Sequence, residues 1–279
     1  MYNQLGKLIA KSKRLFIFTG SGISIPSNIP PYNGPKGLWE VPPTQIIDPM
    51  NNLTKHKLDF NQKPIWNWVH AYRTFLNGAK PNPAHEGILK LQEHFWKIGR
   101  ELTLATQTLD GIHADLMNSS KVLTPNGAKK EGDSHYGFID GLIELHGNLN
   151  YMTCLDECHV SLYKIPSTLK ENEVPICSKC EQPMRPHMLL YDEYYSEYRQ
   201  KANTMMEKSL NADCMIVIAM SLRTQLPNAL TYEHIDEGKP TFEINTEKVI
   251  KTTMKNVHYI TEPCEKAVPL LVDEIISNS

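Results

Sequence analysis

The sequence lacks a long apolar run. Its 279 residues contain no uninterrupted apolar segment close to the ~20 residues that a membrane-spanning helix requires. The N-terminal stretch MYNQLGKLIAKSKRLFIF contains no apolar core followed by a small-residue cleavage site. Membrane insertion and secretion are therefore not expected, and the predicted location is the cytoplasm, or the nucleus if the organism has one.

An excess of one charge is also absent. Lys and Arg total 29 and Asp and Glu total 31, so the formal net charge is −2. Nucleic acid and anionic membrane surfaces are therefore not expected as general partners. The 41% hydrophobic and 22% charged content is typical of a soluble globular protein. The length allows one large domain, or a large domain with a small satellite.

Short apolar segments alternate with helical patterns along the chain. The expected strands are 14–19, 101–106, 142–147, 187–191, 213–220, 241–245 and 257–260. The expected helices are 3–12, 64–77, 84–98, 194–210 and 265–276. This alternation predicts an α/β fold in which helices cover both faces of a parallel sheet. Residues 26–50, which include seven prolines, are predicted to form an irregular loop, and 124–135 a polar surface loop.

The strand at 14–19 ends in a glycine turn, Gly20-Ser21-Gly22. Such a turn lets backbone N–H groups approach a phosphate, and the N-terminus of a following helix favours negative charge. The full G-x-G-x-x-G fingerprint needs a third glycine at position 25, where this chain has Ile25. The turn by itself fits a phosphate site and an ordinary tight turn equally well.

Four of the six cysteines form two close pairs, Cys154/Cys158 and Cys177/Cys180. Without a secretion signal, paired thiols indicate metal ligands rather than disulfides. Four thiolates can close tetrahedrally around Zn²⁺ and leave no open position, so the site would be structural. His159 could replace Cys158 as a ligand, and four thiols without a metal are the remaining alternative. The segment between the pairs has little core of its own, so a metal would supply much of its folding free energy.

Seven motifs together resemble those of the sirtuin family. They are TGSGIS…SNIPPYNG…GLW (19–39), AKPNPAH (79–85), TQTLDGIH (106–113), ELHGNLNYMTC (144–154), CSKCEQPMRPHMLLYDE (177–193), IAMSLRTQLPNAL (218–230) and EIN (243–245). They occur in the order of the family and cover nearly the whole chain. We therefore interpret the sequence as similar to sirtuins throughout.

The resemblance implies a discontinuous Rossmann-like NAD-binding domain formed by residues 1–148 and 186–279, with a helical and loop insertion at about 35–80. It also implies a small zinc-binding module at 149–185. NAD and an acylated lysine of a protein substrate would meet between them. The implied activity is that of an NAD-dependent protein lysine deacylase, which releases nicotinamide and transfers the acyl group to ADP-ribose.

The resemblance further implies roles for individual residues. His146 would be the general base, a role that suits an imidazole because its pKa lies near neutral pH. His85 and His113, which also fall in matching motifs, are predicted to be structural. The implied NAD-binding residues are Gly20, Ser21, Gly22, Ser24, Tyr32, Asn33, Gln107, Thr108, Asp110, Ser221 and Asn245. The charged residues of MRPHMLLYDEYY are expected to form a solvated rim.

Several residues depart from the family pattern at the reacting end of NAD. Thr108 replaces an Asn, Asn33 replaces an Arg, Pro31 replaces an Asp and Tyr32 replaces a Phe. A Thr hydroxyl is shorter than an Asn amide, and loss of the Arg removes a fixed cation. Two further functions therefore stay open. One is ADP-ribosyl transfer or NAD hydrolysis, and the other is NAD binding without catalysis. The sequence indicates neither the acyl-chain preference nor the oligomeric state.

Overall fold

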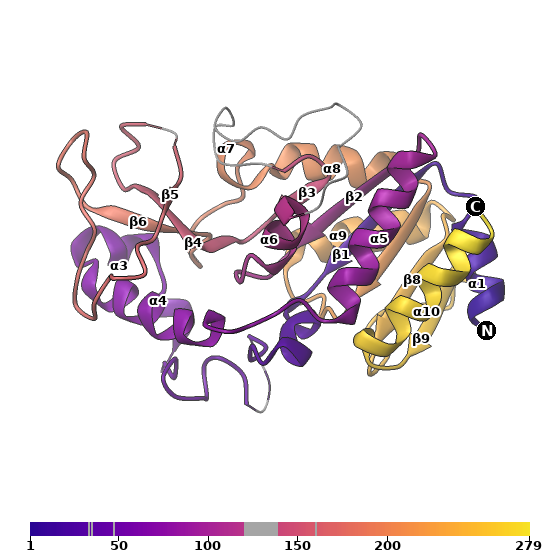
Figure 1. The fold of residues 1–279 in the computed structure, drawn as a ribbon, viewed down its shortest axis with the longest axis horizontal. Coiled ribbons are helices and arrows are strands. Elements are labelled where there is room, and N and C mark those ends of the chain that lie inside the picture. Colours follow the sequence, from indigo (N-terminus) through magenta and orange to yellow (C-terminus); the bar gives the residue numbers. More distant parts are fainter. Residues whose placement is uncertain (33, 35, 47, 120–138, 160) are drawn as a thin grey trace.

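Six parallel strands form the main sheet of the protein, in the order β3-β2-β1-β7-β8-β9. The computed structural model describes residues 1–279 except 33, 35, 47, 120–138 and 160 (Figure 1). The predicted loop at 124–135 therefore lies outside the described residues. The strands are β1 (Arg14–Thr19), β2 (Glu101–Thr106), β3 (Leu142–Glu144), β7 (Cys214–Ile218), β8 (Thr241–Asn245) and β9 (Val257–Thr261).

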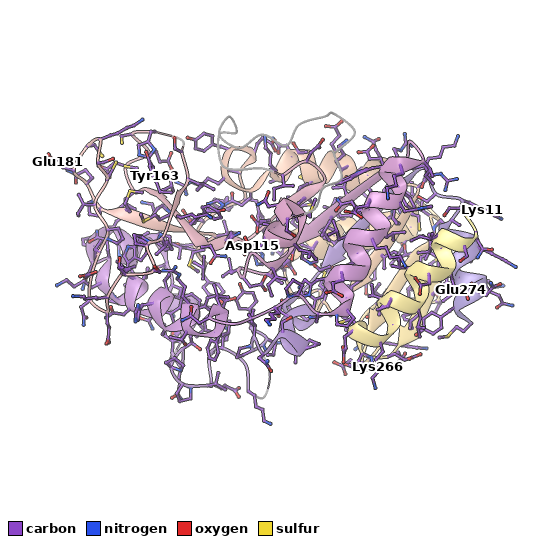
Figure 2. All side chains as sticks on the ribbon, viewed as in Figure 1. Lys11, Asp115, Tyr163, Glu181, Lys266 and Glu274 are labelled. Carbon is purple, nitrogen blue, oxygen red and sulfur yellow. The ribbon has the colours of Figure 1, made fainter. Side chains whose placement is uncertain are left out.

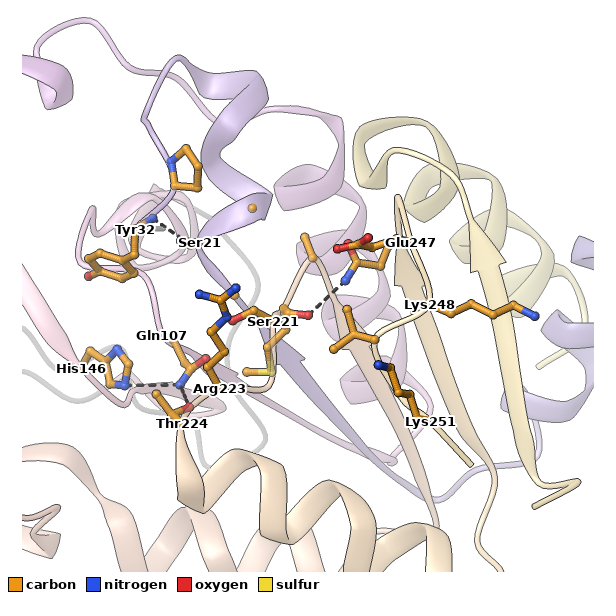
Figure 3. Close-up of a pocket in the computed structure, with 17 residues that line it drawn as sticks. Ser21, Tyr32, Gln107, His146, Ser221, Arg223, Thr224, Glu247, Lys248 and Lys251 are labelled. Atoms are coloured by element: carbon orange, nitrogen blue, oxygen red, sulfur yellow. Dashed lines mark hydrogen bonds between the residues drawn. The ribbon is translucent and has the colours of Figure 1, made fainter. Parts of the chain in front are cut away.

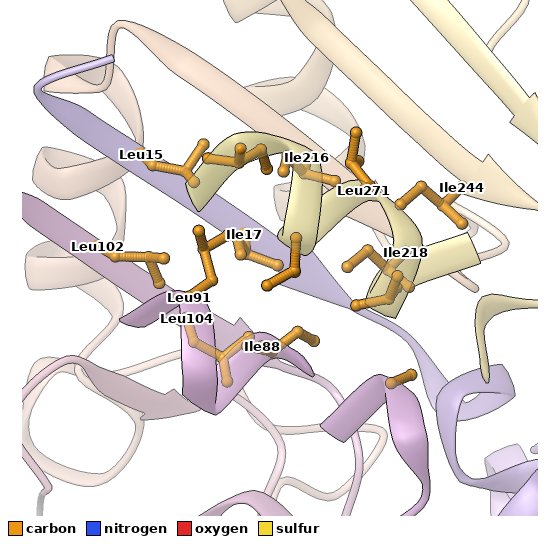
Figure 4. Close-up of a cluster of buried hydrophobic side chains, with 14 of the residues drawn as sticks. Leu15, Ile17, Ile88, Leu91, Leu102, Leu104, Ile216, Ile218, Ile244 and Leu271 are labelled. Carbon is orange, nitrogen blue, oxygen red and sulfur yellow. The ribbon is translucent and has the colours of Figure 1, made fainter. Parts of the chain in front are cut away.

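Helices cover both faces of this sheet, as the alternating pattern predicts. Along β1, Leu15 and Ile17 face a core that contains residues of α1 (Tyr2–Ile9), α5 (Pro83–Lys97), α6 (Ile112–Ser119) and α10 (Cys264–Ser277). Figure 4 shows Leu15 and Ile17 in this cluster with Leu91 of α5 and Leu271 of α10. Phe16 and Phe18 point to the opposite core, which α8 (Ala202–Asn211) and α9 (Gln225–Asp236) cover. Successive side chains of β1 therefore enter the two apolar cores on opposite faces of the sheet.

A smaller lobe contains an antiparallel sheet in the order β5-β4-β6, formed by β4 (Gly147–Cys154), β5 (Tyr163–Lys164) and β6 (Met184–Met188). The helices α2 (Pro49–Asn52), α3 (Lys55–Phe60) and α4 (Lys63–Leu76) belong to the earlier insertion. Trp66 of α4 lies in the same apolar core as Leu149 and Met184, and its Nε1 donates to the Met184 carbonyl at 2.9 Å. The insertion and the cysteine-bearing segment thus share one core.

Charged side chains lie on the outside of both lobes. Figure 2 shows Lys11 and Lys266 on the outside of the large lobe, and Tyr163 and Glu181 on the small lobe at the other end. Among the helices of the described residues, none is long and apolar enough to cross a membrane.

Several predicted elements have different limits in the structure; for example, the helix predicted at 3–12 is α1 and ends at Ile9. The strand predicted at 142–147 ends at Glu144, because Gly147 begins β4 instead. Gly147 has φ +95°, and a Cβ there would lie 2.2 Å from the His187 carbonyl oxygen, so only glycine fits. The strand predicted at 187–191 is β6, which ends at Met188. The helix predicted at 194–210 is divided into α7 (Glu197–Gln200) and α8 by Lys201, whose φ is +54°.

The glycine turn after β1 is closely packed against the segment that follows β7. A Cβ on Gly20 would lie 2.6 Å from the Ala219 carbonyl oxygen and 2.7 Å from the Met220 Cα. A Cβ on Gly22 would lie 2.9 Å from the same oxygen. The turn continues into a 3₁₀-helix, η1 (Ser21–Ser27), rather than an α-helix. Both glycines are therefore required by backbone packing, whatever binds nearby.

We expect Gly20→Ala to lower the free energy of unfolding by about 1–3 kcal/mol, because the added methyl group meets backbone atoms that cannot rotate away. Urea denaturation measures this change. Ser21→Ala is the matched control: it adds no volume and removes only the 3.3 Å hydrogen bond from the Tyr32 N–H, so a loss below about 1 kcal/mol is expected. Wild-type stability in Gly20→Ala would contradict the packing argument.

Candidate functional site

The carboxyl ends of β1, β7 and β8 border a cleft of about 540 Å³. The chain continues from β1 to β2 on one side of β1 and later adds β7 on the other, so the strand order reverses between β1 and β7. Open α/β sheets bind ligands at such a switch point. Eight of the predicted site residues line the cleft: Gly20, Ser21, Gly22, Tyr32, Gln107, His146, Ser221 and Asn245.

Three other predicted residues form a buried polar network instead of lining the cleft. The Ser24 hydroxyl donates to Asp110 Oδ2 at 2.7 Å, and the Thr108 hydroxyl donates to Asp110 Oδ1 at 3.3 Å. The Ile112 N–H also donates to Oδ1, at 2.9 Å. Burial raises the pKa of the Asp110 carboxyl, while these hydrogen bonds act in the opposite direction. The network holds the loop that follows β2, which begins with Gln107. The remaining predicted residue, Asn33, lies outside the described residues.

His146 lies between β3 and β4, where the chain passes from the large sheet to the small one. Its carbonyl oxygen accepts from the Leu189 N–H at 2.9 Å, which fixes the backbone. Its Nε2 lies 3.3 Å from Gln107 Nε2 and 3.0 Å from the Tyr195 hydroxyl (Figure 3 shows the Gln107 contact). Burial lowers the pKa of His146 to about 4, with a smaller opposite effect from the Gln107 backbone. The imidazole is therefore neutral at pH 7 and can accept a proton.

The other two histidines of matching motifs lie away from the cleft. His85 is fully buried in the first turn of α5, where its Nδ1 accepts from the Asn82 N–H at 3.4 Å in a capping box. The His113 ring lies 4.6 Å from the His85 ring, centroid to centroid. These contacts agree with the structural role expected for both.

Arg223 is a cleft residue that the sequence analysis did not single out. It is exposed, lines the cleft, and forms no hydrogen bond or ion pair with any residue that the structure describes. Figure 3 shows its guanidinium on the same side of the cleft as Ser21. The next residue, Thr224, accepts a 2.6 Å hydrogen bond from Gln107 Nε2 through its hydroxyl. Both residues lie in a matching motif, but a motif does not show which way a loop side chain points.

The far end of the cleft is formed by the loop that follows β8. The Glu243 carboxylate accepts from the Val249 and Ile250 N–H groups at 2.8 and 3.0 Å and so shapes this loop. The Lys248 ammonium lies 4.6 Å from the centre of the Tyr259 ring. Exposed Lys251 also lines the cleft. The cleft is therefore lined by Arg223, Lys248 and Lys251 against one acidic residue, Glu247, and this excess of positive charge favours an anionic ligand.

Asn245, at the end of β8, is predicted to bind cofactor and has a structural contact of its own. Its Nδ2 donates to the Met220 carbonyl at 3.0 Å (Figure 3), and its Oδ1 accepts from the Thr246 N–H. It therefore ties β8 to the segment that follows β7.

Of the charged residues expected on a solvated rim at 184–195, Asp192 is exposed as predicted, but the prediction is wrong for Arg185 and Glu193. The Arg185 side chain is 1% exposed and forms a bidentate pair with the Glu193 carboxylate at 2.6 and 2.7 Å. Arg199 pairs with the same carboxylate at 3.0 Å and with Glu157 of the cysteine-rich segment. The local sequence does not show whether a charged residue is solvated or is buried in an ion pair with a residue from another segment.

The four paired cysteines converge in the small lobe, as predicted. All four sulfur atoms lie within 4.8 Å of one another, with Cys154 and Cys180 at 3.4 Å and Cys158 and Cys177 at 3.6 Å. Tetrahedral Zn²⁺ with Zn–S bonds of about 2.3 Å separates its sulfur ligands by about 3.8 Å. The donor set therefore fits zinc. His159 Nε2 lies 3.3 Å from Cys177 Sγ, outside the group of four.

These features define a Rossmann-like α/β protein with a cleft at the switch point of its sheet and a four-cysteine cluster in a small lobe. The chain belongs to the Sir2 family, whose family model matches residues 20–132 and 132–225. The sirtuin resemblance of its motifs is thus confirmed.

Relatives match nearly the whole chain at low identity. An "NAD-dependent protein deacylase" of Leptospira interrogans is 25% identical over 271 residues, covering 96% of this chain and 95% of the relative. An "NAD-dependent protein deacylase 1" of Caldanaerobacter subterraneus is 28% identical over 251 residues, covering 88% and 87%. A solved Sir2 homologue in complex with NAD is 24% identical with a TM-score of 0.74, covering 98% and 93%, and shows the same fold.

We expect the purified protein to contain about one zinc ion per chain, because a four-thiolate set binds one ion. Mass spectrometry of the elements, together with a colorimetric zinc assay, measures this content. Cys177→Ser is expected to lose the metal and to unfold at a lower temperature. Cys264→Ser, at the start of α10, is the control and is expected to keep it. Metal-free wild-type protein of unchanged stability would contradict the assignment.

Proposed function

We propose that this chain is an NAD-dependent protein lysine deacylase that transfers the acyl group to ADP-ribose and releases nicotinamide. The names of its relatives support the activity. The observation that carries the proposal is the neutral His146 imidazole, which lines the same cleft as the glycine turn and the unpaired Arg223.

The residues of the cleft fit a dinucleotide. A volume of about 540 Å³ lies within the range of about 300–1,000 Å³ for ligand pockets. We assign the diphosphate to Arg223 and the backbone of Gly20–Gly22, the adenosine to Ser221 and Asn245, and the nicotinamide ribose to the region of Gln107 and His146. Bound NAD would supply an electrophilic ribose carbon once nicotinamide leaves. The protein would contribute binding, orientation and a proton acceptor at His146 Nε2.

An aromatic group beside His146 suits an uncharged acyl chain. The Tyr32 ring lies 6.5 Å from the His146 ring and stacks on Trp39 at 5.9 Å. Trp39 in turn lies 5.5 Å from Trp68, all distances being between ring centres. Arg73, on the same helix as Trp68, donates to the Ile165 and Pro166 carbonyl groups. Its guanidinium is therefore occupied, which argues against recognition of a carboxylated acyl chain by this residue.

One observation favours the second candidate function, ADP-ribosyl transfer or NAD hydrolysis. Thr108, which replaces an Asn of the family pattern, is buried, and its hydroxyl bonds Thr106 and Asp110. It therefore offers no polar group to the cleft that would hold a water or a substrate carbonyl in place of the Asn amide. Such a site would favour ADP-ribosyl transfer or NAD hydrolysis, in which the same ribose carbon reacts without transfer of an acyl group.

The decisive experiment follows all the products of NAD. The protein is incubated with NAD and with acetyl-, longer acyl- and succinyl-lysine peptides, and O-acyl-ADP-ribose, free ADP-ribose and labelled protein are measured. O-acyl-ADP-ribose is expected with uncharged acyl chains. Free ADP-ribose or labelled protein without this product would support the second candidate. Bound NAD with no product would show a binding module.

We expect His146→Ala to bind NAD with an affinity within about threefold of wild type but to lose about 100-fold or more of its acyl transfer, because it removes the proton acceptor. Calorimetry and product formation measure the two properties. His56→Ala is the control, since His56 is an exposed residue of α3 whose ring makes an edge-to-face contact with Phe60. Undiminished transfer in His146→Ala would overturn the assignment.

We expect Arg223→Ala to weaken NAD binding about tenfold, because a hydrogen bond between charged groups contributes about 1.5–3 kcal/mol and part is replaced by water. Calorimetric titration at two salt concentrations measures the loss and its electrostatic origin. Arg14→Ala is the matched control, because Arg14 is exposed at the amino end of β1, opposite to the cleft. Equal affinities of Arg223→Ala and wild type would exclude Arg223 from the phosphate site.

A further inference from the structure

Tyr195 contacts His146 from a distant part of the chain. Its hydroxyl lies 3.0 Å from His146 Nε2, and the two rings are nearly parallel, with an angle of 17° and centres 6.1 Å apart. Tyr195 lies just before α7, in the segment that returns from the small lobe to the large sheet. The motif at 177–193 ends two residues earlier and the next begins at 218, so no family motif covers this tyrosine.

Two side-chain groups face Nε2 of His146 and bear on the choice between its two neutral tautomers. Gln107 Nε2, an amide donor, lies 3.3 Å from this nitrogen, and the Tyr195 hydroxyl is the second group that faces it. An unprotonated Nε2 can accept from either group, and the proton of the neutral ring then lies on Nδ1. The Tyr195 contact is the shorter of the two, and the Gln107 amide also donates to Thr224 at 2.6 Å.

The backbone around Tyr195 is held rigidly. Two residues earlier, the Glu193 carboxylate binds Arg185 and Arg199 and accepts from the Leu190 N–H at 3.0 Å. One residue later, the Ser196 N–H donates to Gln200 Oε1 at 3.0 Å. The Tyr195 ring packs against the core cluster that contains Phe16 and Phe18. The hydroxyl is therefore positioned before any ligand binds, which is the condition for a group that orients a catalytic side chain.

We propose that Tyr195 is a positioning residue, which donates to His146 Nε2 and so keeps the imidazole in the tautomer protonated on Nδ1. This inference rests on the proposed role of His146 as a base. When a substrate hydroxyl arrives, it displaces the Tyr195 O–H from the single lone pair of His146 Nε2. The substrate proton then passes to that nitrogen. The phenol keeps its own proton throughout, because its oxygen can accept from the new Nε2–H.

The surroundings of the imidazole leave Tyr195 as its main side-chain donor. The Tyr32 ring lies 6.5 Å away, and burial raises the pKa of the Tyr32 phenol well above its usual value. The Tyr195 pKa is raised to about 12 by burial, so this phenol also stays protonated. Arg223 lines the same cleft, together with Lys248, Lys251 and the acidic Glu247. Within the described residues, no carboxylate forms an ion pair with His146.

The test compares Tyr195→Phe with wild type by long-range ¹H–¹⁵N spectra of histidine-labelled protein. The His146 signals are assigned by their loss in His146→Gln. Wild type is expected to show one neutral tautomer with Nε2 unprotonated. Tyr195→Phe is expected to show both tautomers and a higher His146 pKa, because the hydrogen bond that stabilises the neutral ring is lost. Tyr194→Phe is the matched control, since the neighbouring Tyr194 is 94% exposed. Circular dichroism checks that each variant is folded.

Kinetics give the second readout. Tyr195→Phe is expected to lower kcat about fivefold to tenfold, to leave KM for NAD within about twofold, and to have no further effect in a His146→Ala background. An unchanged tautomer and pKa in Tyr195→Phe, or a rise in kcat that would mark the phenol as an obstacle, would overturn the proposal. Absence of acyl transfer in wild type would instead count against the proposed function, and the spectra would still decide whether Tyr195 controls His146.

Discussion

The parallel pairing of β1 with β7 is the constraint on which the rest of the site depends. It joins the two halves of the sheet at the point where the strand order reverses, and it brings the turn after β1 against the segment after β7. Gly20 is packed so closely on Ala219 and Met220 that no side chain fits. The cleft opens at this contact, so its first wall is fixed by backbone packing. Arg223 and Thr224 follow directly from the same segment, which is why a cation and a partner of Gln107 lie at the reversal of the sheet.

Buried carboxylates organise the loops around this wall. Asp110 holds the loop after β2, Glu243 holds the loop after β8, and Glu193 holds the segment that carries Tyr195. Each carboxylate loses hydration on burial, and each regains favourable interactions from backbone N–H groups or arginines. In the part of the chain that the structure describes, no ion pair compensates His146, so burial dominates and its neutral form is favoured. The loss of hydration on burial thus has two results. The three carboxylates bind and hold their loops, whereas His146 becomes a neutral proton acceptor.

The small lobe is attached to the large one by more than chain connectivity. Its core includes residues of α4 from the early insertion as well as β4 and β6, and Arg199 of the large lobe's entry segment pairs with Glu157 beside Cys158. A metal bound by the four cysteines would therefore stabilise a lobe whose contacts extend through Arg199 and Glu193 toward Tyr195. The domain limits of 1–148, 186–279 and 149–185 stay a prediction, since the shared core does not follow them.

The sequence by itself determined the features that depend on neighbouring residues. The apolar runs at 14–19 and 213–220 predict buried parallel strands, the two cysteine pairs predict one metal cluster, and the ordered motifs predict the family. It did not predict α9, because two of the five buried residues there, Thr231 and His234, are polar and no apolar stripe results. Only the tertiary structure decided the directions of the remaining side chains. Ser24, Thr108 and Asp110 form hydrogen bonds with one another. Arg223 points into the cleft, and Tyr195 contacts His146. These directions depend on contacts between segments up to 117 positions apart, and no local pattern of residues encodes them.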